Sequence, residues 1–308
     1  MKAIVMILVA WVAAGTGVLA AAPTTPERGS AWESVSRILK TPDVFASGYH
    51  RFNLPRRDLT LRLGDVTVAP ELALGAWLGF GGEPDDAMLM GDLVLTPREL
   101  GPALAELAIR KISVTAIHNH LVGEEPRLVY VHVHAQGKAV DLATRLDRVL
   151  ALTGTPRPVA KAVPKPLAID TAAVFHALGR SGKANGTVAQ VSYVLVPGTV
   201  TMHGHAVIPA LGYGSPVNLQ MVSPARAVAT GDFAVPGNEV EPLLLALARH
   251  HIVATALHTH MIGESPSVYF IHFWADGAPS AVTTGLRAAV DATRGDEHPR
   301  PGRRRNEP

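Results

Sequence analysis

The chain contains no cysteine. This absence excludes disulfide bridges, thiolate metal ligands, cysteine nucleophiles and lipid attachment at a signal-peptide cysteine. The fold must therefore be held together by core burial, and a chain of 308 residues with 47% hydrophobic content can bury cores in two domains. Any bound metal must be held by His, Asp, Glu or backbone oxygen.

Long apolar runs are also lacking, except at the N-terminus. The segment MKAIVMILVAWVAAGTGVLAAAPTTP has one lysine, then an uncharged apolar run, then small residues around Ala20. This pattern predicts a secretory signal peptide over residues 1–20, cleaved near Ala20, and a retained membrane anchor is the alternative. No later segment offers the roughly 18 apolar residues that a membrane span needs. We expect an exported soluble protein, periplasmic or secreted, without a stable membrane span.

Net charge is small, at +2, and it is located at the C-terminus. Residues 294–308 hold five arginines against three acidic residues, which accounts for the whole excess. We expect residues 295–308 to form a disordered basic tail on a nearly neutral body, which argues against a nucleic-acid partner. The sequence also lacks a Gly-rich phosphate loop and a G-x-S-x-G elbow, which disfavours nucleotide-dependent and α/β-hydrolase chemistry.

The chain contains one long repeat. The segment 111-KISVTAIHNHLVGEEPRLVYVHVHAQG-137 returns as 251-HIVATALHTHMIGESPSVYFIHFWADG-277, and 91-GDLVLTPRELGP-102 lies over 231-GDFAVPGNEVEP-242 at the same offset of 140. A repeat of this length indicates a duplicated domain. We predict one unit over residues 21–152, a stiff Pro-rich linker over 153–167 and a second unit over 168–294.

Each unit is predicted to be α+β, with a mainly antiparallel sheet. Helices are expected over 31–40, 138–152 and 169–179, with a further one that starts after Thr96, because Pro97 suits a first helical position. Strands are expected over 59–68, 86–95, 114–120 and 127–135. A helix is therefore inserted before a histidine-bearing hairpin in each unit, and we expect the units to pack about a pseudo-twofold axis.

The hairpin carries a possible metal motif. Residues i and i+2 of a strand share a face, so His118 and His120 can turn toward a common point. If His118 lies opposite Tyr130, His132 lies opposite Ala116 on the same face. These imidazoles and Glu124 would then converge as metal ligands, and the second copy repeats them. The predicted ligands are His118, His120, Glu124, His132, His258, His260, Glu264 and His272.

Other recurring residues leave alternatives open. His134 becomes Trp274 in the second copy, so it is either specific to the first copy or incidental. Asp92 recurs as Asp232, and it suits either a hairpin end or an acceptor for a histidine N–H. The histidines themselves could instead form a half-buried structural network.

Nearly the whole chain after residue 20 resembles one family. The blocks 74-LGAWLGF-80, 89-LMGDLVLTPREL-100, 114-VTAIHNHLVGEEPRLVYVHVHAQG-137 and 254-ATALHTHMIGESPSVYFIHFWADG-277 are similar to the LppY/LpqO family. The resemblance implies a bacterial exported protein with a tandem domain of unknown function, and it supplies no reaction. This chain lacks the lipidation cysteine of the lipoprotein members.

Three functions follow as hypotheses. The first is an exported protein that binds a divalent metal, with zinc favoured, and that acts as a hydrolase if Glu124 and Glu264 serve as general bases. The second is a non-enzymatic envelope module with structural histidines, which binds a small molecule or an envelope component. The third is a cupin-like non-haem oxygenase or isomerase, suggested by the spacing His-x-His-x3-Glu. The sequence does not indicate the oligomeric state.

Overall fold

A computed structural model describes residues 30–159, 170–185 and 187–293. The predicted signal peptide, the later part of the predicted linker and the predicted basic tail lie outside the described residues. In the part of the chain that is described, no helix has both the length and the apolar character needed to cross a membrane.

The first unit contains four helices and nine strands among the described residues. Its elements are α1 (Ser30–Leu39), β1 (Asp43–Ala46), β2 (Tyr49–Pro55), β3 (Leu61–Leu63), β4 (Val66–Val68), α2 (Pro70–Ala73), β5 (Gly75–Glu83), β6 (Asp86–Leu95), α3 (Pro97–Ile109), β7 (Ser113–His118), β8 (Glu124–Glu125), β9 (Val129–Gly137) and α4 (Ala139–Leu150).

The second unit repeats this order, with a short 3₁₀ turn (η1) before the helix that corresponds to α3. Its elements are α5 (Thr171–Ala177), β10 (Lys183–Asn185), β11 (Val188–Tyr193), β12 (Thr201–Met202), β13 (His205–Ala206), α6 (Pro209–Gly212), β14 (Ser215–Ser223), β15 (Arg226–Pro236), η1 (Gly237–Glu239), α7 (Val240–Arg249), β16 (Val253–His258), β17 (Glu264–Ser265), β18 (Val268–Gly277) and α8 (Pro279–Thr293).

Each unit is built on an open six-stranded antiparallel sheet. The strand order is β1-β2-β5-β6-β9-β7 in the first unit and β10-β11-β14-β15-β18-β16 in the second, so the two sheets have one topology. This confirms the predicted tandem α+β units. It also disfavours the cupin-like hypothesis, because a sheet whose edge strands remain apart is not a barrel.

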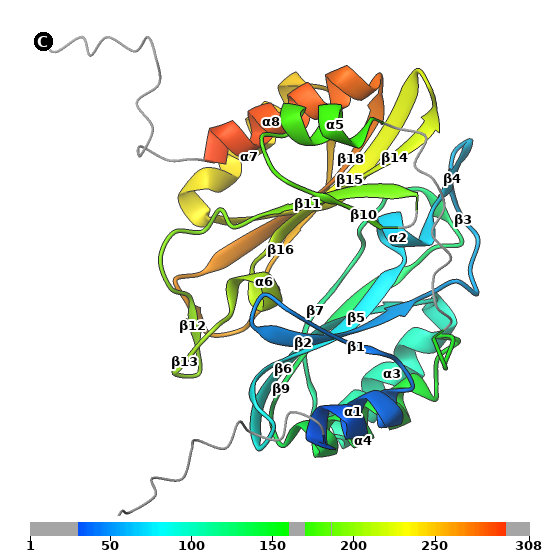
Figure 1. The fold of residues 1–308 in the computed structure, drawn as a ribbon, viewed down its shortest axis with the longest axis vertical. Coiled ribbons are helices and arrows are strands. Elements are labelled where there is room, and N and C mark those ends of the chain that lie inside the picture. The colour runs from blue at the N-terminus through cyan, green and yellow to red at the C-terminus, as the bar shows by residue number, and fades with distance from the viewer. Residues whose placement is uncertain (1–29, 160–169, 186, 294–308) are drawn as a thin grey trace, which may run out of the picture.

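The two units stack sheet against sheet, with helices on the outside. In Figure 1, α5, α7 and α8 cover the outer face of one sheet, and α1, α3 and α4 cover the outer face of the other. The inner faces meet, so β6 is buried on both sides. Its alternate residues Leu89 and Leu93 pack in the core of the first unit, whereas Met88 and Met90 belong to a third core between the units.

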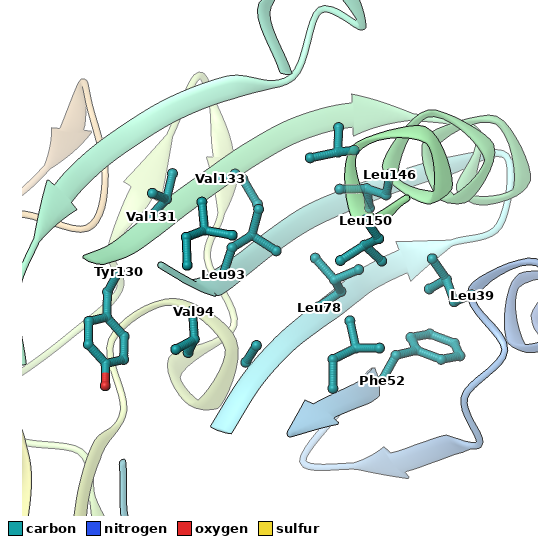
Figure 2. Packing of buried hydrophobic residues seen from close by; sticks show 14 of the residues in the cluster. Leu39, Phe52, Leu78, Leu93, Val94, Tyr130, Val131, Val133, Leu146 and Leu150 are labelled. Atoms are coloured by element: carbon teal, nitrogen blue, oxygen red, sulfur yellow. The ribbon is translucent and has the colours of Figure 1, made fainter. Parts of the chain in front are cut away.

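The core of the first unit lies between the sheet and α4. Figure 2 shows Leu146 and Leu150 of α4 in the same buried cluster as Val131 and Val133 of β9 and Leu78 of β5. These five side chains are almost completely buried. Burial of each such side chain stabilises the fold by about 1.5–3 kcal/mol relative to full exposure, which explains why an amphipathic helix follows each hairpin.

Helix α3 begins after Thr96, as its sequence predicted. The Thr96 N–H donates to Glu99 Oε2 at 2.7 Å, which satisfies one of the free N–H groups at the helix start. The same carboxylate accepts from Arg56 Nη1 at 2.9 Å and from the Gly154 N–H at 2.5 Å. Glu99 therefore joins the start of α3 to the end of β2 and to the chain that leaves α4.

Two local predictions need correction. Residues 59–68 do not form one strand, because the chain turns at Gly64 with φ +58° and makes the hairpin β3–β4. The strand predicted over 114–120 ends at His118, so His120 lies in the loop that follows β7.

A short helix from the second unit docks on the first. Leu211 of α6 is 4% exposed, and its Cδ1 lies 2.5 Å from the position that a Cβ on Gly79 would take. Only glycine leaves room for this approach, because carbon atoms in contact need about 3.5–4.0 Å. A second contact between the units is made by Gln220 of β14. Its side-chain amide accepts from the Ala69 N–H at 2.8 Å and donates to the Thr67 carbonyl at 2.9 Å.

Candidate metal centre

The hairpin histidines point into the space between the two sheets. In the first unit Ala116 pairs with His132 and His118 pairs with Tyr130, which is the register that the sequence predicted. In the second unit the corresponding pair is Ala256 with His272. Because alternate residues of β9 enter the core of their own unit, His132 is left on the inner face.

The inner faces bring the histidines of both units into one cluster. Ring centroids lie 3.8 Å apart for His118 and His258, 3.9 Å for His120 and His272, and 3.7 Å for His132 and His260. Each of these contacts joins one unit to the other. The rings of His118 and His120 are 5.0 Å apart, and those of His258 and His260 are 4.9 Å apart. The cluster thus follows the pseudo-twofold relation, and it is shared by the units.

Two aspartates complete the cluster. Asp92 of β6 pairs with His132 across the sheet, and Asp232 of β15 pairs with His272. Asp92 Oδ2 lies 3.5 Å from His120 Nε2, and Asp232 Oδ1 lies 2.5 Å from His272 Nδ1. From the sequence, we predicted Asp92 only as a hairpin-end residue or as an acceptor for a histidine N–H. Its recurrence at the offset of the histidines was the available signal.

The ligand atoms fall into four groups, in each of which they lie within 4.8 Å of one another. Two groups each contain one aspartate and two histidines, and two contain histidines alone and draw on both units. The groups are Asp92, His120 and His132; Asp232, His260 and His272; His118, His120 and His272; and His118, His132, His258 and His260.

Burial keeps most of these imidazoles neutral. It lowers the pKa of His118, His120, His132 and His260 below the usual value, and the charges of neighbouring histidines act in the same direction. Burial and His272 lower the pKa of His258 to about 4. Neutral imidazole is the form that ligates metals, so the cluster holds its nitrogens in the competent state near pH 7.

Burial has the opposite effect on the carboxyl group of Asp92. It raises the pKa of Asp92 well above the usual value, and the charge of Asp232 contributes further. The charge of Arg51 opposes this rise. A cation bound beside the two carboxylates would relieve their repulsion.

Many polar atoms of the cluster have no hydrogen-bond partner within the described part of the chain. His118 Nε2 and His272 Nε2 lie 3.1 Å apart, and His272 Nδ1 lies 3.2 Å from the Gly231 carbonyl. The buried atoms without such a partner are Asp92 Oδ1, His118 Nδ1, His120 Nε2, His132 Nε2, His258 Nδ1, His258 Nε2 and His260 Nε2. Buried polar atoms are normally paired, so this concentration fits a bound cation.

A small cavity touches the cluster. It has a volume of about 10 Å³, and its lining includes His132, His260, Met90 and Leu211. This volume is close to the smallest that holds one water molecule. The cavity therefore has no room for an ion together with several water ligands, and the side chains would have to supply the ligands.

The two predicted glutamates lie outside the four groups. Glu124 is in β8, opposite Leu63, and its Oε1 accepts from the Leu128 N–H at 3.2 Å. Glu264 makes the equivalent bond with the Val268 N–H at 3.2 Å. Each carboxylate thus accepts from an N–H four residues further along the chain. The geometry therefore gives no support to the ligand and general-base roles predicted for Glu124 and Glu264.

His134 also lies outside the groups. It is buried, and its ring centroid is 5.6 Å from that of His203 in the other unit. Burial together with the charge of His203 lowers its pKa to about 4.

Sequence comparison agrees with the two-unit architecture. Residues 33–152 and 172–292 each match the family described as Domain of Unknown Function (DUF1259). No curated protein and no solved structure matches the chain.

Proposed function

The chain belongs to this family of unknown function, and we propose that its task is to hold a divalent transition metal, with zinc favoured, in the histidine–aspartate cluster between its units. The observation that carries the proposal is the convergence of His118, His132, His258 and His260 within 4.8 Å of one another. Neutral imidazole nitrogens with carboxylate oxygens are a donor set typical of zinc and other first-row metals.

The ligands proposed here differ in part from the sequence prediction. The six histidines remain, and Asp92 and Asp232 replace Glu124 and Glu264 as the carboxylate ligands, because each aspartate lies in a group with two histidines. The glutamates keep a separate task. By accepting the N–H groups of Leu128 and Val268, they fix the loops that follow the histidines.

Hydrolysis is the reaction class that we propose for such a centre. A divalent ion held here would supply Lewis acidity. The protein supplies buried imidazoles that are held neutral, and each group of one aspartate and two histidines matches a ligand set that occurs in catalytic zinc sites. Turnover of a panel of activated esters and phosphoesters, compared with and without added zinc, tests this part of the proposal.

Elemental analysis tests metal binding directly. Protein purified without a histidine tag from metal-replete growth is expected to contain near-stoichiometric transition metal, whereas only traces would contradict the proposal. The variant His118→Ala/His258→Ala is expected to lose the metal and keep its far-UV circular dichroism. His205→Ala is the matched control, because His205 is exposed and belongs to none of the groups. If the wild type never contains metal and the His118→Ala/His258→Ala variant is less stable, the result supports the alternative in which the histidines have a structural role.

Export is the second part of the proposal. The apolar N-terminal segment and the resemblance to LppY/LpqO proteins both support it. The intact mass of protein recovered from the periplasm or the culture medium is expected to correspond to a chain that begins at Ala21. Recovery of the full-length chain from the cytoplasm alone would contradict export.

A further inference from the structure

The cluster offers more ligand atoms than one ion can use. Seven buried ligand atoms lack a hydrogen-bond partner within the described residues, and both ring nitrogens of His258 are among them. The two nitrogens of one imidazole point in different directions, so a single ion can bind only one of them. A zinc ion usually has four ligands. One ion in this cluster would leave several buried donors unpaired.

The carboxylates lead to the same conclusion. Asp92 and Asp232 never occur in the same group, and each belongs to a group with two histidines of its own. An ion beside Asp92 would leave Asp232 without an ion of its own, with His272 Nδ1 2.5 Å from its Oδ1. A buried carboxylate without a compensating cation is costly, which favours a second cation beside Asp232.

The two halves also present closely similar geometry. His120 stacks on Tyr130 at 3.4 Å with 12° between the ring planes, and His260 stacks on Phe270 at the same distance and angle. The centroid distance between His118 and His132 is 4.9 Å, and that between His258 and His272 is also 4.9 Å. An arrangement that binds an ion in one half is therefore available in the other half.

We propose that the cluster is binuclear. This inference rests on the proposed function. One divalent ion is bound by Asp92, His120 and His132, and the other by Asp232, His260 and His272. His118 and His258, which stack on each other at 3.8 Å, lie between the two sets and supply further ligands to both ions.

Metal stoichiometry tests the proposal. The metal-free full chain is titrated with Zn²⁺ against a chromogenic chelator, and the loaded protein is weighed by native mass spectrometry. The expected result is two ions per chain. A single ion overturns the binuclear centre and leaves the proposed function standing, whereas no bound ion overturns both.

Matched variants assign each ion to its half. Asp92→Asn and Asp232→Asn are each expected to bind one ion, and Asp141→Asn, which alters an exposed carboxylate paired with Arg145, is expected to bind two. Loss of both ions from either single variant would indicate one indivisible site and overturn the proposal. Because the wild-type stoichiometry decides the question by itself, a variant that fails to fold does not remove the test. With Co²⁺, magnetic coupling between the ions in electron paramagnetic resonance is expected in the wild type and in neither single variant.

Discussion

The contact between Leu211 and Gly79 allows a quantitative test of how the units dock. Leu211→Ala removes a side chain that is 4% exposed, and truncations of this kind usually cost about 2–5 kcal/mol of unfolding free energy. Gly79→Ala places a Cβ 2.5 Å from Leu211 Cδ1 and 3.1 Å from atoms of Trp77 and Tyr49. Such overpacking costs about 1–3 kcal/mol.

The two changes should not add. Once Leu211 is truncated, the atom closest to the new Cβ is gone, and the added methyl group fills part of the space that Leu211 occupied. The double variant is therefore expected to be more stable than the sum of the single effects by about 1–2 kcal/mol.

Urea unfolding provides the measurement. Unfolding free energies of the wild type, both single variants and the double variant are taken from coincident circular dichroism and tryptophan fluorescence transitions. Gly101→Ala combined with Leu211→Ala is the control, because a Cβ on Gly101 meets nothing within 4 Å. A coupling below about 0.5 kcal/mol for Gly79 and Leu211 would refute the docking described here.

Three further predictions concern the metal, pH and the strand that carries Asp232. Zinc at about 100 times its dissociation constant is expected to stabilise the wild type by about 2.7 kcal/mol per site. The stabilisation of His258→Ala by zinc should be much smaller. Equal increases in melting temperature for the two proteins in calorimetry would contradict this. Burial would raise the pKa of Glu99, but hydrogen bonds from Arg56 and two backbone N–H groups outweigh it and lower the pKa below 4.5. The ionised Glu99 therefore contributes its full stabilisation of the fold above pH 4.5, and this contribution is lost as pH falls through the lower folded-state pKa. On acidification the wild type should lose more unfolding free energy than Glu99→Gln. Parallel profiles of urea midpoint against pH for the two proteins would contradict this. Gly231→Ala would place a Cβ 2.0 Å from the Pro216 carbonyl oxygen, so its melting temperature should fall by several degrees while that of Gly101→Ala does not.

Local sequence patterns predicted the start of α3 and the pairing within the hairpin, because residues close together in the chain determine both features. Thr96 and Pro97 gave the start of α3, since helix starts depend on nearby N–H groups. The pairing of Ala116 with His132 followed once His118 was placed opposite Tyr130, because strand register is continuous along a hairpin. These contacts lie close together in the chain.

The composition of the candidate metal centre could not be obtained in the same way. The stacking of His132 on His260 joins residues of different units, and no local pattern shows which faces of two domains meet. The spacing of Glu124 from His120 resembles a ligand motif, but spacing alone does not reveal that the carboxylate accepts from the Leu128 N–H. Asp92 comes from a strand earlier in the chain, and only the sheet register places it beside His132.

The sharing of histidines across the two sheets has a consequence for the repeat itself. Because the contact between units is nearly self-complementary, a lone unit would have to pair with an identical copy to bring all of these histidines together. Joining two copies in one polypeptide makes that encounter intramolecular and independent of protein concentration. It also releases each copy to change alone, as the exchange of His134 for Trp274 illustrates.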